Sequence, residues 1–252
     1  QFGSVNALPR IMVAPNGARR TKADHPALPV TIDELVITGL ACFQAGAGAM
    51  HAHVRDENQQ HVLDAGLYRE LTSEMALQVP ELLVQITTEA VGRYSPGEQR
   101  QLVRDVQPAS VSISLTEILS EGEKTEAASL YAFCADEDIA VQHILYSVEE
   151  LRLFMALTTA GFFPPVQPQL LFVLGRYSKD QQSDPEQLDP FIDRLNSYGL
   201  EADWAVCAFG QAESRCAARA FELGGKCRIG FENSLWNADG ARAEDNAQRV
   251  AE

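Results

Sequence analysis

The sequence predicts an α/β protein built as a (β/α)8 barrel, the TIM-barrel fold. Short apolar runs typical of buried strands alternate with amphipathic helix-like segments, and the unit recurs about every thirty residues. The length of 252 residues also suits this fold. No Gly-x-Gly-x-x-Gly turn follows the first strand, which argues against a doubly wound nucleotide-binding sheet. We therefore expect one barrel domain over residues 1–252.

The first unit shows the local signals on which the prediction depends. Residues 11–14 are an apolar strand, and a turn with two arginines follows at 15–20. Residues 21–29 are polar and contain prolines, so they predict a loop. Thr31 with Glu34 three positions later is a capping box, which predicts a helix from there to about residue 45.

The same alternation continues to the C-terminus. Further strands are expected over residues 47–54, 82–87, 110–115, 139–146, 170–174, 204–209 and 226–231. Helices are expected over residues 64–79, 96–106, 124–137, 148–160, 184–199 and 213–223. A final helix is expected to begin at Asp239 and to be cut short by the end of the sequence.

Composition narrows the function classes. The net charge of −15 argues against general binding to nucleic acid or to anionic membranes, since both need a basic surface. The five cysteines contain no Cys-x-x-Cys pair, so we expect reduced thiols. No apolar run is long enough for a signal core or a membrane span. These features predict a soluble, cytoplasmic protein.

A candidate metal site begins with His51 and His53. Residues i and i+2 of a strand share a face, so the two imidazoles should lie side by side at the carboxyl end of the second strand, where barrel active sites are found. Glu232 shares its parity with Arg228 on the predicted eighth strand and could supply a third ligand. A three-ligand zinc site keeps an open position for substrate. Alternatively, the histidines only donate hydrogen bonds and Glu232 only pairs with Arg228.

Other polar residues at strand ends are less specific. Arg19 and Arg20 could clamp a carboxylate or phosphate, or could form a solvated basic turn. The hydroxyl groups of the third and fourth strands could contact a substrate or could bond to nearby carbonyls; they belong to Thr87, Thr88, Ser110, Ser112 and Ser114. The remaining histidines have no same-face ligand partner and are expected to be structural or at the surface; they are His25, His61 and His143.

Four blocks of the sequence resemble the β-keto acid cleavage enzymes, whose best-known member is the 3-keto-5-aminohexanoate cleavage enzyme. They are residues 13–20, 50–56, 172–175 and 224–233, and the likeness extends from about residue 11 to the C-terminus. The resemblance implies a zinc-dependent barrel and suggests a homo-oligomer. It also implies a reaction of a β-keto acid with acetyl-CoA, by Claisen and retro-Claisen steps, to give acetoacetate and a new acyl-CoA.

The resemblance also implies roles for individual residues. The family's zinc ligands fall on His51, His53 and Glu232. Its substrate-contacting hydroxyls fall on Thr87 and Ser112, and its catalytic arginine on Arg228.

Two positions depart from the family pattern. Asn233 stands where the best-known member has an aspartate that pairs with the arginine as the proposed base, and an amide cannot accept a proton at neutral pH. Either another group or a water is then the base, or Asn233 only orients Arg228. Arg19 stands where the aminohexanoate enzyme has a glutamate that holds the substrate's ammonium group. The reversed charge predicts a β-keto acid with a neutral or anionic distal end, such as a β-keto dicarboxylate.

Two other functions remain open at this point. A zinc-dependent aldolase or β-diketone hydrolase would use the same metal site without CoA. A non-catalytic, metal-dependent metabolite-binding barrel would bind β-keto acids without turning them over. Fold alone does not decide among these functions, because barrels support many chemistries.

Overall fold

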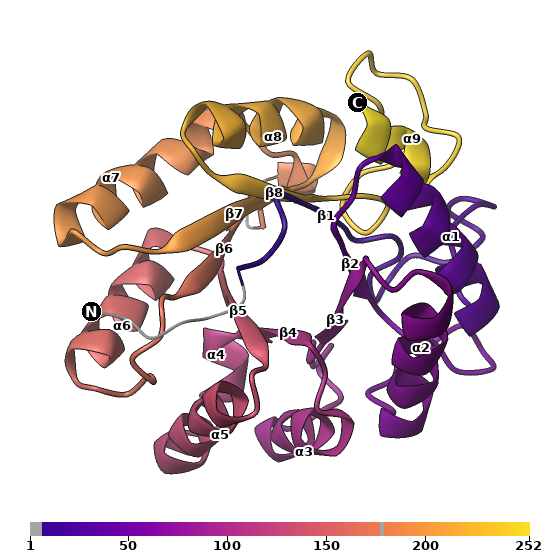
Figure 1. Cartoon of the computed structure of the whole chain (residues 1–252). Helices are drawn as coiled ribbons and strands as arrows, with labels where there is room; N and C mark the ends of the chain where they lie inside the picture. Colours follow the sequence, from indigo (N-terminus) through magenta and orange to yellow (C-terminus); the bar gives the residue numbers. More distant parts are fainter. Residues whose placement is uncertain (1–6, 177–178) are drawn as a thin grey trace.

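The computed structural model describes residues 7–176 and 179–252. Eight parallel strands follow one another around a closed barrel in sequence order, and β8 pairs with β1 to complete it. Figure 1 shows the barrel end-on, with the helices forming a ring outside the strands. The predicted (β/α)8 fold is therefore confirmed.

The observed elements follow the predicted alternation closely. The strands are β1 Ile11–Val13, β2 Ala49–Ala52, β3 Leu83–Thr87, β4 Ser110–Ser114, β5 Ala140–Leu145, β6 Gln169–Leu174, β7 Asp203–Ala208 and β8 Lys226–Ile229. The α-helices are α1 Ile32–Ala45, α2 Ala65–Gln78, α3 Pro96–Val106, α4 Leu115–Ile118, α5 Lys124–Asp136, α6 Val148–Thr159, α7 Asp189–Tyr198, α8 Glu213–Glu222 and α9 Asn246–Ala251. Single 3₁₀ turns are η1 Lys179–Gln181, η2 Pro185–Leu188 and η3 Gly210–Ala212.

Side-chain caps explain where several helices begin. The Thr31 hydroxyl accepts from the Glu34 amide at 3.1 Å, and the Glu34 carboxylate accepts from the Thr31 amide at 3.1 Å. Ser95 and Glu98 form the same reciprocal pair before α3. Each pair satisfies two amide groups that a helix N-terminus leaves unbonded, so the predicted capping box at Thr31 is confirmed.

Two helical predictions were wrong in detail, and one short helix was missed. The single helix predicted over residues 184–199 is the 3₁₀ turn η2 followed by α7, because Pro190 lacks the amide that a continuous helix would use. The last helix begins at Asn246, not Asp239, because residues 236–242 form a small hairpin and Asp245 is the cap. The short helix α4 was not predicted; Ser114 caps it directly after β4.

Two strands end earlier than predicted, and this affects the candidate site. β2 ends at Ala52, so only His51 of the pair lies on the strand. β8 ends at Ile229, and Gly230 then turns the chain with a φ of +138°. Glu232 therefore lies in a turn, and the argument that it shares a strand face with Arg228 was wrong.

The strand register places a polar layer inside the barrel below His51. Gln85 of β3 is the register partner of His51, and Ser110 of β4 is the partner of Gln85. The Gln85 amide donates to the Ser110 hydroxyl at 3.2 Å and to the Gln142 carbonyl at 3.3 Å. All three side chains are buried, so the hydrogen bonds fix the orientation of the Gln85 amide group.

The main apolar core lies between the strands and the surrounding helices. Its fully buried members include Leu35 of α1, Tyr68 of α2 and Phe154 of α6. The five cysteines are buried and free. Within the described ranges, no helix has both the length and the apolar character needed to cross a membrane.

Candidate active site

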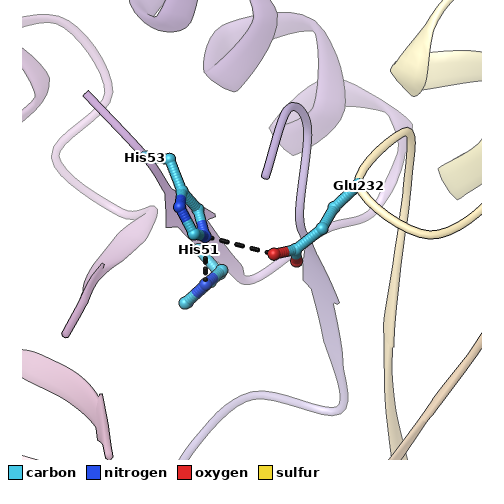
Figure 2. Close-up of side chains that lie close together, drawn as sticks. All are labelled: His51, His53 and Glu232. Atoms are coloured by element: carbon cyan, nitrogen blue, oxygen red, sulfur yellow. Dashed lines mark hydrogen bonds and ion pairs between the residues drawn. The ribbon is translucent and has the colours of Figure 1, made fainter. Parts of the chain in front are cut away.

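Three side chains from distant parts of the chain converge at the carboxyl end of the barrel (Figure 2). His51 ends β2, His53 follows it, and Glu232 reaches in from the turn after β8. The His53 Nε2 atom lies 3.1 Å from His51 Nε2 and 3.1 Å from Glu232 Oε1. All three ligand atoms lie within 4.8 Å of one another. The structure thus brings together the three side chains that the sequence singled out, with Glu232 in a turn and not on the strand.

Hydrogen bonds fix which nitrogen of His51 carries a proton. Its Nδ1 lies 2.7 Å from Gln85 Oε1, an oxygen that can only accept. Nδ1 of His51 is therefore the donor. Burial, followed by the positive charge of Arg228, lowers the pKa of His51 well below its ordinary value, so the ring is neutral. Its Nε2 then has a free electron pair directed at the other two side chains.

Hydrogen bonds through His61 show in the same way that Nδ1 of His53 carries a proton. The His61 Nε2 atom lies 2.9 Å from the Glu89 carbonyl oxygen and must donate to it. Burial lowers the pKa of His61 to about 3, so the ring is neutral and its Nδ1 is an acceptor. The His53 Nδ1 atom, 3.0 Å away, donates to that nitrogen. The other ring nitrogen of His53, Nε2, faces His51 and Glu232.

The converging atoms fit a bound cation. Burial raises the pKa of Glu232, but Arg228 and the histidines lower it more, so this carboxyl group stays ionised. Two imidazole Nε2 atoms and a carboxylate oxygen then face one another at hydrogen-bond distances. Two imidazoles and a carboxylate are a donor set that Zn²⁺ accepts once the ligand nitrogens carry no proton, with a position left open.

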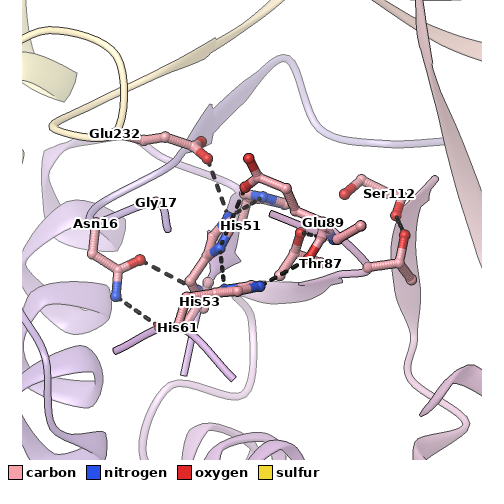
Figure 3. Close-up of polar contacts among 12 residues, drawn as sticks. Asn16, Gly17, His51, His53, His61, Thr87, Glu89, Ser112 and Glu232 are labelled. Atoms are coloured by element: carbon pink, nitrogen blue, oxygen red, sulfur yellow. Dashed lines mark hydrogen bonds and ion pairs between the residues drawn. The ribbon is translucent and has the colours of Figure 1, made fainter. Parts of the chain in front are cut away.

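The loop after β1 holds His53 in place (Figure 3). The Asn16 side chain donates to the His53 carbonyl at 2.8 Å and accepts from the His53 amide at 3.2 Å. The buried Arg55 guanidinium donates to the carbonyl groups of Asn16 at 3.2 Å and Gly17 at 2.6 Å. Gly17 has a φ of +65°, and a Cβ there would lie 2.6 Å from Glu232 Cγ. This loop thus contacts both His53 and Glu232.

A second set of contacts holds the turn that presents Glu232. The Gly230 backbone amide donates to the Glu213 carboxylate at 3.2 Å, and the Phe231 backbone amide donates to the side-chain oxygen of Asn246 at 2.9 Å. Asn246 also donates to the Pro15 carbonyl at 3.0 Å, which ties the turn to the loop after β1. Glu213 is itself paired with the fully buried Arg249. The position of Glu232 therefore depends on α8 and α9 as well as β8.

Arg228 lies beside the carboxylate, as the alternative interpretation of Glu232 predicted. Its Nη2 atom lies 3.5 Å from Glu232 Oε2, and its Nε and Nη1 atoms have no hydrogen-bond partner in the described part of the chain. The Cys207 sulfur forms a hydrogen bond with Arg228, and it accepts a hydrogen bond from the side-chain amide of Asn233 at 2.6 Å. One carboxylate oxygen of Glu232 thus faces the histidines, and the other pairs with Arg228. Asn233 is linked to Arg228 indirectly, because both side chains hydrogen-bond to Cys207.

These groups open into a cavity of about 330 Å³. The predicted substrate-contacting residues all line it; they are Arg19, Thr87, Ser112, Arg228 and Asn233. The buried Ser112 hydroxyl has no partner among the described residues, whereas the Thr87 oxygen accepts from the Glu89 amide at 3.0 Å. Arg20 also lines the cavity, and no described carboxylate lies within ion-pair distance of Arg19 or Arg20. The structure thus places all of these residues at one cavity.

Sequence reasoning missed the residues that bond to the histidines. His61 was expected to be structural or at the surface, but it is buried and bonded to His53. It returns to the site through a tight turn that pairs residue 55 with residue 61. Gln85 was not singled out, although a glutamine within an otherwise apolar strand was a signal that the barrel interior held a polar group.

Replacing Gln85 with leucine is expected to weaken metal binding roughly 10- to 100-fold, the usual effect of removing a hydrogen-bond partner of a metal-ligating histidine. The change leaves His51 free to turn or to shift its proton to the other nitrogen. Competition with a chelator measures the affinity. Gln85→Glu retains an acceptor oxygen and should retain binding, so equal weakening in both variants would contradict this role.

Comparison with known proteins places the chain among enzymes of one reaction type. A family model described as beta-keto acid cleavage enzyme matches residues 10–252. The 3-oxoadipate:acetyl-CoA acetyltransferase of Cupriavidus necator is 25% identical, with 96% of this chain and 86% of that protein aligned. The 3-keto-5-aminohexanoate cleavage enzyme of Fusobacterium nucleatum is 23% identical, with 93% of this chain and 85% of that protein aligned.

Solved structures share the fold. A binary complex of ObcA with oxaloacetate superposes with a TM-score of 0.72 at 14% identity. The alignment covers 90% of this chain and 62% of the ObcA chain, so this chain spans less than two thirds of its length. At this identity, the likeness supports the barrel architecture and nothing more specific.

Proposed function

Because this chain belongs to the beta-keto acid cleavage enzyme family, we propose that it reacts a β-keto acid with acetyl-CoA at a zinc ion held by His51, His53 and Glu232. The products are acetoacetate and a new acyl-CoA. The observation that supports the zinc site is the convergence of two imidazole nitrogens and an ionised carboxylate at one point. The named acetyl-CoA-dependent relative supports the second substrate.

In this proposal, the side chains of the cavity bind and orient the keto acid. Zinc, when bound, would supply Lewis-acid polarisation of the ketone. Arg228 lines the cavity, and its guanidinium can bind the carboxylate of the substrate. The hydroxyl groups of Ser112 and Thr87, which also line the cavity, can donate to substrate oxygens. Burial of Arg228 and Ser112 keeps water from competing for these hydrogen bonds.

Because the Asn233 amide cannot accept a proton, another group must take the proton from acetyl-CoA. The amide donates to Cys207, and burial raises the pKa of Cys207 to about 12, so that side chain is a neutral thiol. Besides Glu232, the cavity wall holds three carboxylates, Asp24, Glu89 and Glu117. Burial raises the pKa of Glu117, which strengthens this carboxylate as a proton acceptor once it is ionised. We assign Asn233 a positioning role on Arg228 through Cys207.

The test of this function begins with the purified protein and its metal content. Acetoacetate release is then measured over a panel of β-keto acids, with and without acetyl-CoA. The proposal predicts stoichiometric zinc and release that requires acetyl-CoA. Cleavage without CoA would instead establish the aldolase or hydrolase function, which the missing aspartate at position 233 favours. Zinc without turnover across the panel would favour a binding protein.

The substrate is expected to have an anionic distal end. Arg19 and Arg20 line the cavity without a described carboxylate partner, and the Cupriavidus necator relative is named for 3-oxoadipate, a β-keto dicarboxylate. Arg19→Glu should lower kcat/KM for a β-keto dicarboxylate by about 10-fold or more, the effect of roughly 1.4 kcal/mol in binding. Arg10→Glu, at a distance from the cavity wall, is the charge-matched control. Equal turnover of the dicarboxylate and of 3-keto-5-aminohexanoate by the unaltered protein would contradict this specificity.

A further inference from the structure

Tyr146 lines the active-site cavity on the side away from the candidate zinc ligands. It follows β5 directly and is two residues from Ile144, which lines the same cavity. In the closed ring of eight strands, β5 is the strand across the barrel from β1, as Figure 1 shows. His51 on β2 and Glu232 after β8 come from the two strands that pair with β1. Tyr146 therefore lies across the cavity from these two side chains.

The Tyr146 hydroxyl is a free hydrogen-bonding group at the cavity wall. It has no hydrogen bond within the described residues, but, unlike the Tyr131 hydroxyl, it is not fully buried. Two other hydroxyl groups of this wall are occupied, since Thr88 donates to the Ser112 carbonyl at 2.9 Å and Ser114 caps α4. The Tyr146 hydroxyl can therefore bond to a molecule in the cavity without breaking a contact within the protein.

The surroundings of Tyr146 hold its ring and keep its hydroxyl protonated. The ring packs against an apolar cluster that includes Val173 of β6. The Arg176 guanidinium lies over the ring, 5.0 Å from its centroid, at a distance typical of a cation–π contact. Burial, followed by the negative charges of Glu89 and Glu117, raises the pKa of Tyr146. The side chain is therefore a neutral donor whose ring is held in place before any substrate binds.

We propose that Tyr146 binds acetyl-CoA by donating a hydrogen bond from its hydroxyl to the thioester carbonyl oxygen. This inference rests on the proposed function. A keto acid bound at His51, His53 and Glu232 would occupy the opposite wall, which leaves the side of β5 to the second substrate. A thioester carbonyl oxygen only accepts hydrogen bonds, so a protonated phenol suits it. Negative charge develops on this oxygen when the thioester reacts, and a donor that is already in place stabilises that charge.

The test compares acetyl-CoA with S-ethyl-CoA, a thioether that has the same length but lacks the carbonyl oxygen. Their binding to the full chain, loaded with zinc, is measured by isothermal titration calorimetry. The proposal predicts that acetyl-CoA binds about three- to tenfold more tightly, the preference that one neutral hydrogen bond provides. Tyr146→Phe should bind the two molecules with equal affinity. Tyr198→Phe, a change outside the cavity wall, is the matched control and should retain the preference.

The possible results separate an error in this proposal from an error in the proposed function. If neither CoA derivative binds, the dependence on acetyl-CoA is wrong, and the role of Tyr146 is wrong with it. Equal binding of both derivatives by the unaltered protein, or a preference that persists in Tyr146→Phe, would overturn only the role of Tyr146.

Turnover gives a second measurement of the same contact. Tyr146→Phe should lower kcat/KM for acetyl-CoA on the order of 100-fold, the usual effect of removing a donor to a developing oxyanion. Its zinc content and melting temperature should be unchanged, because the substitution removes only an unbonded hydroxyl. A variant that retains full kcat/KM for acetyl-CoA and loses affinity only for the keto acid would place the hydroxyl on the other substrate and overturn the proposal.

Discussion

Replacing His51 with alanine is expected to abolish stoichiometric metal binding and to lower kcat/KM by about a thousandfold or more. The estimate takes roughly 4 kcal/mol as the charge stabilisation that a bound Lewis acid supplies, at about 1.36 kcal/mol per factor of ten. His51 is fully buried between Gln85 and His53, so the small side chain leaves no group that could replace the ligand. Atomic emission on the purified variant measures the metal, and acetoacetate release measures the activity.

The control for this experiment is a second buried histidine. His143→Phe removes an imidazole from the outer face of β5, away from the cavity that His51 lines, so metal content and turnover should be retained. Circular dichroism establishes that both variants are folded. If His51→Ala retained one equivalent of zinc, the ligand assignment would be wrong. If it lost zinc but retained turnover, the assignment of the metal to catalysis would be wrong instead.

The parts of the site that follow from local patterns were predictable. His51 and His53 are two residues apart at the end of an apolar run, and the period of a strand predicted that their rings would meet. The rings do meet, although β2 ends at Ala52 and His53 follows the strand. Thr31 and Glu34 fixed the first helix because the capping box needs only neighbouring residues. The regular alternation of strand and helix predicted the barrel, and the barrel rule in turn predicted that strand ends would meet.

The rest of the candidate site could not be predicted, because it depends on contacts between segments that are far apart in the sequence. Glu232 was expected to reach the histidines along β8, but the strand ends at Ile229 and the turn is held by Glu213 and Asn246, which no pattern near Glu232 reveals. His61 seemed isolated because its partner His53 becomes its neighbour only after a tight turn. Gln85 became visible as a ligand support only from the register between β2 and β3.

Replacing Gly17 with alanine is expected to weaken metal binding roughly 10- to 100-fold, although Gly17 offers no ligand atom. An added Cβ would lie 2.6 Å from Glu232 Cγ, closer than two carbon atoms can approach, so the carboxylate must move away from His53. Relaxation of the loop is limited because Arg55 holds the Gly17 carbonyl at 2.6 Å. The positive φ of +65° adds a backbone cost of about 1–2 kcal/mol in the free energy of unfolding.

Gly122 offers a control that separates these two effects. It has a similar φ of +75°, but an added Cβ would have no neighbour within 4 Å. Gly122→Ala should therefore lose a similar amount of unfolding free energy and retain full metal affinity. Equal affinities in the two alanine variants would show that Glu232 adapts to the contact, and the loop after β1 would then have no part in positioning it. Both positions require a positive φ, so the backbone cost is shared by the two variants. A loss of metal affinity in Gly17→Ala alone would therefore mean that the glycine is required because the Glu232 carboxylate side chain packs against it.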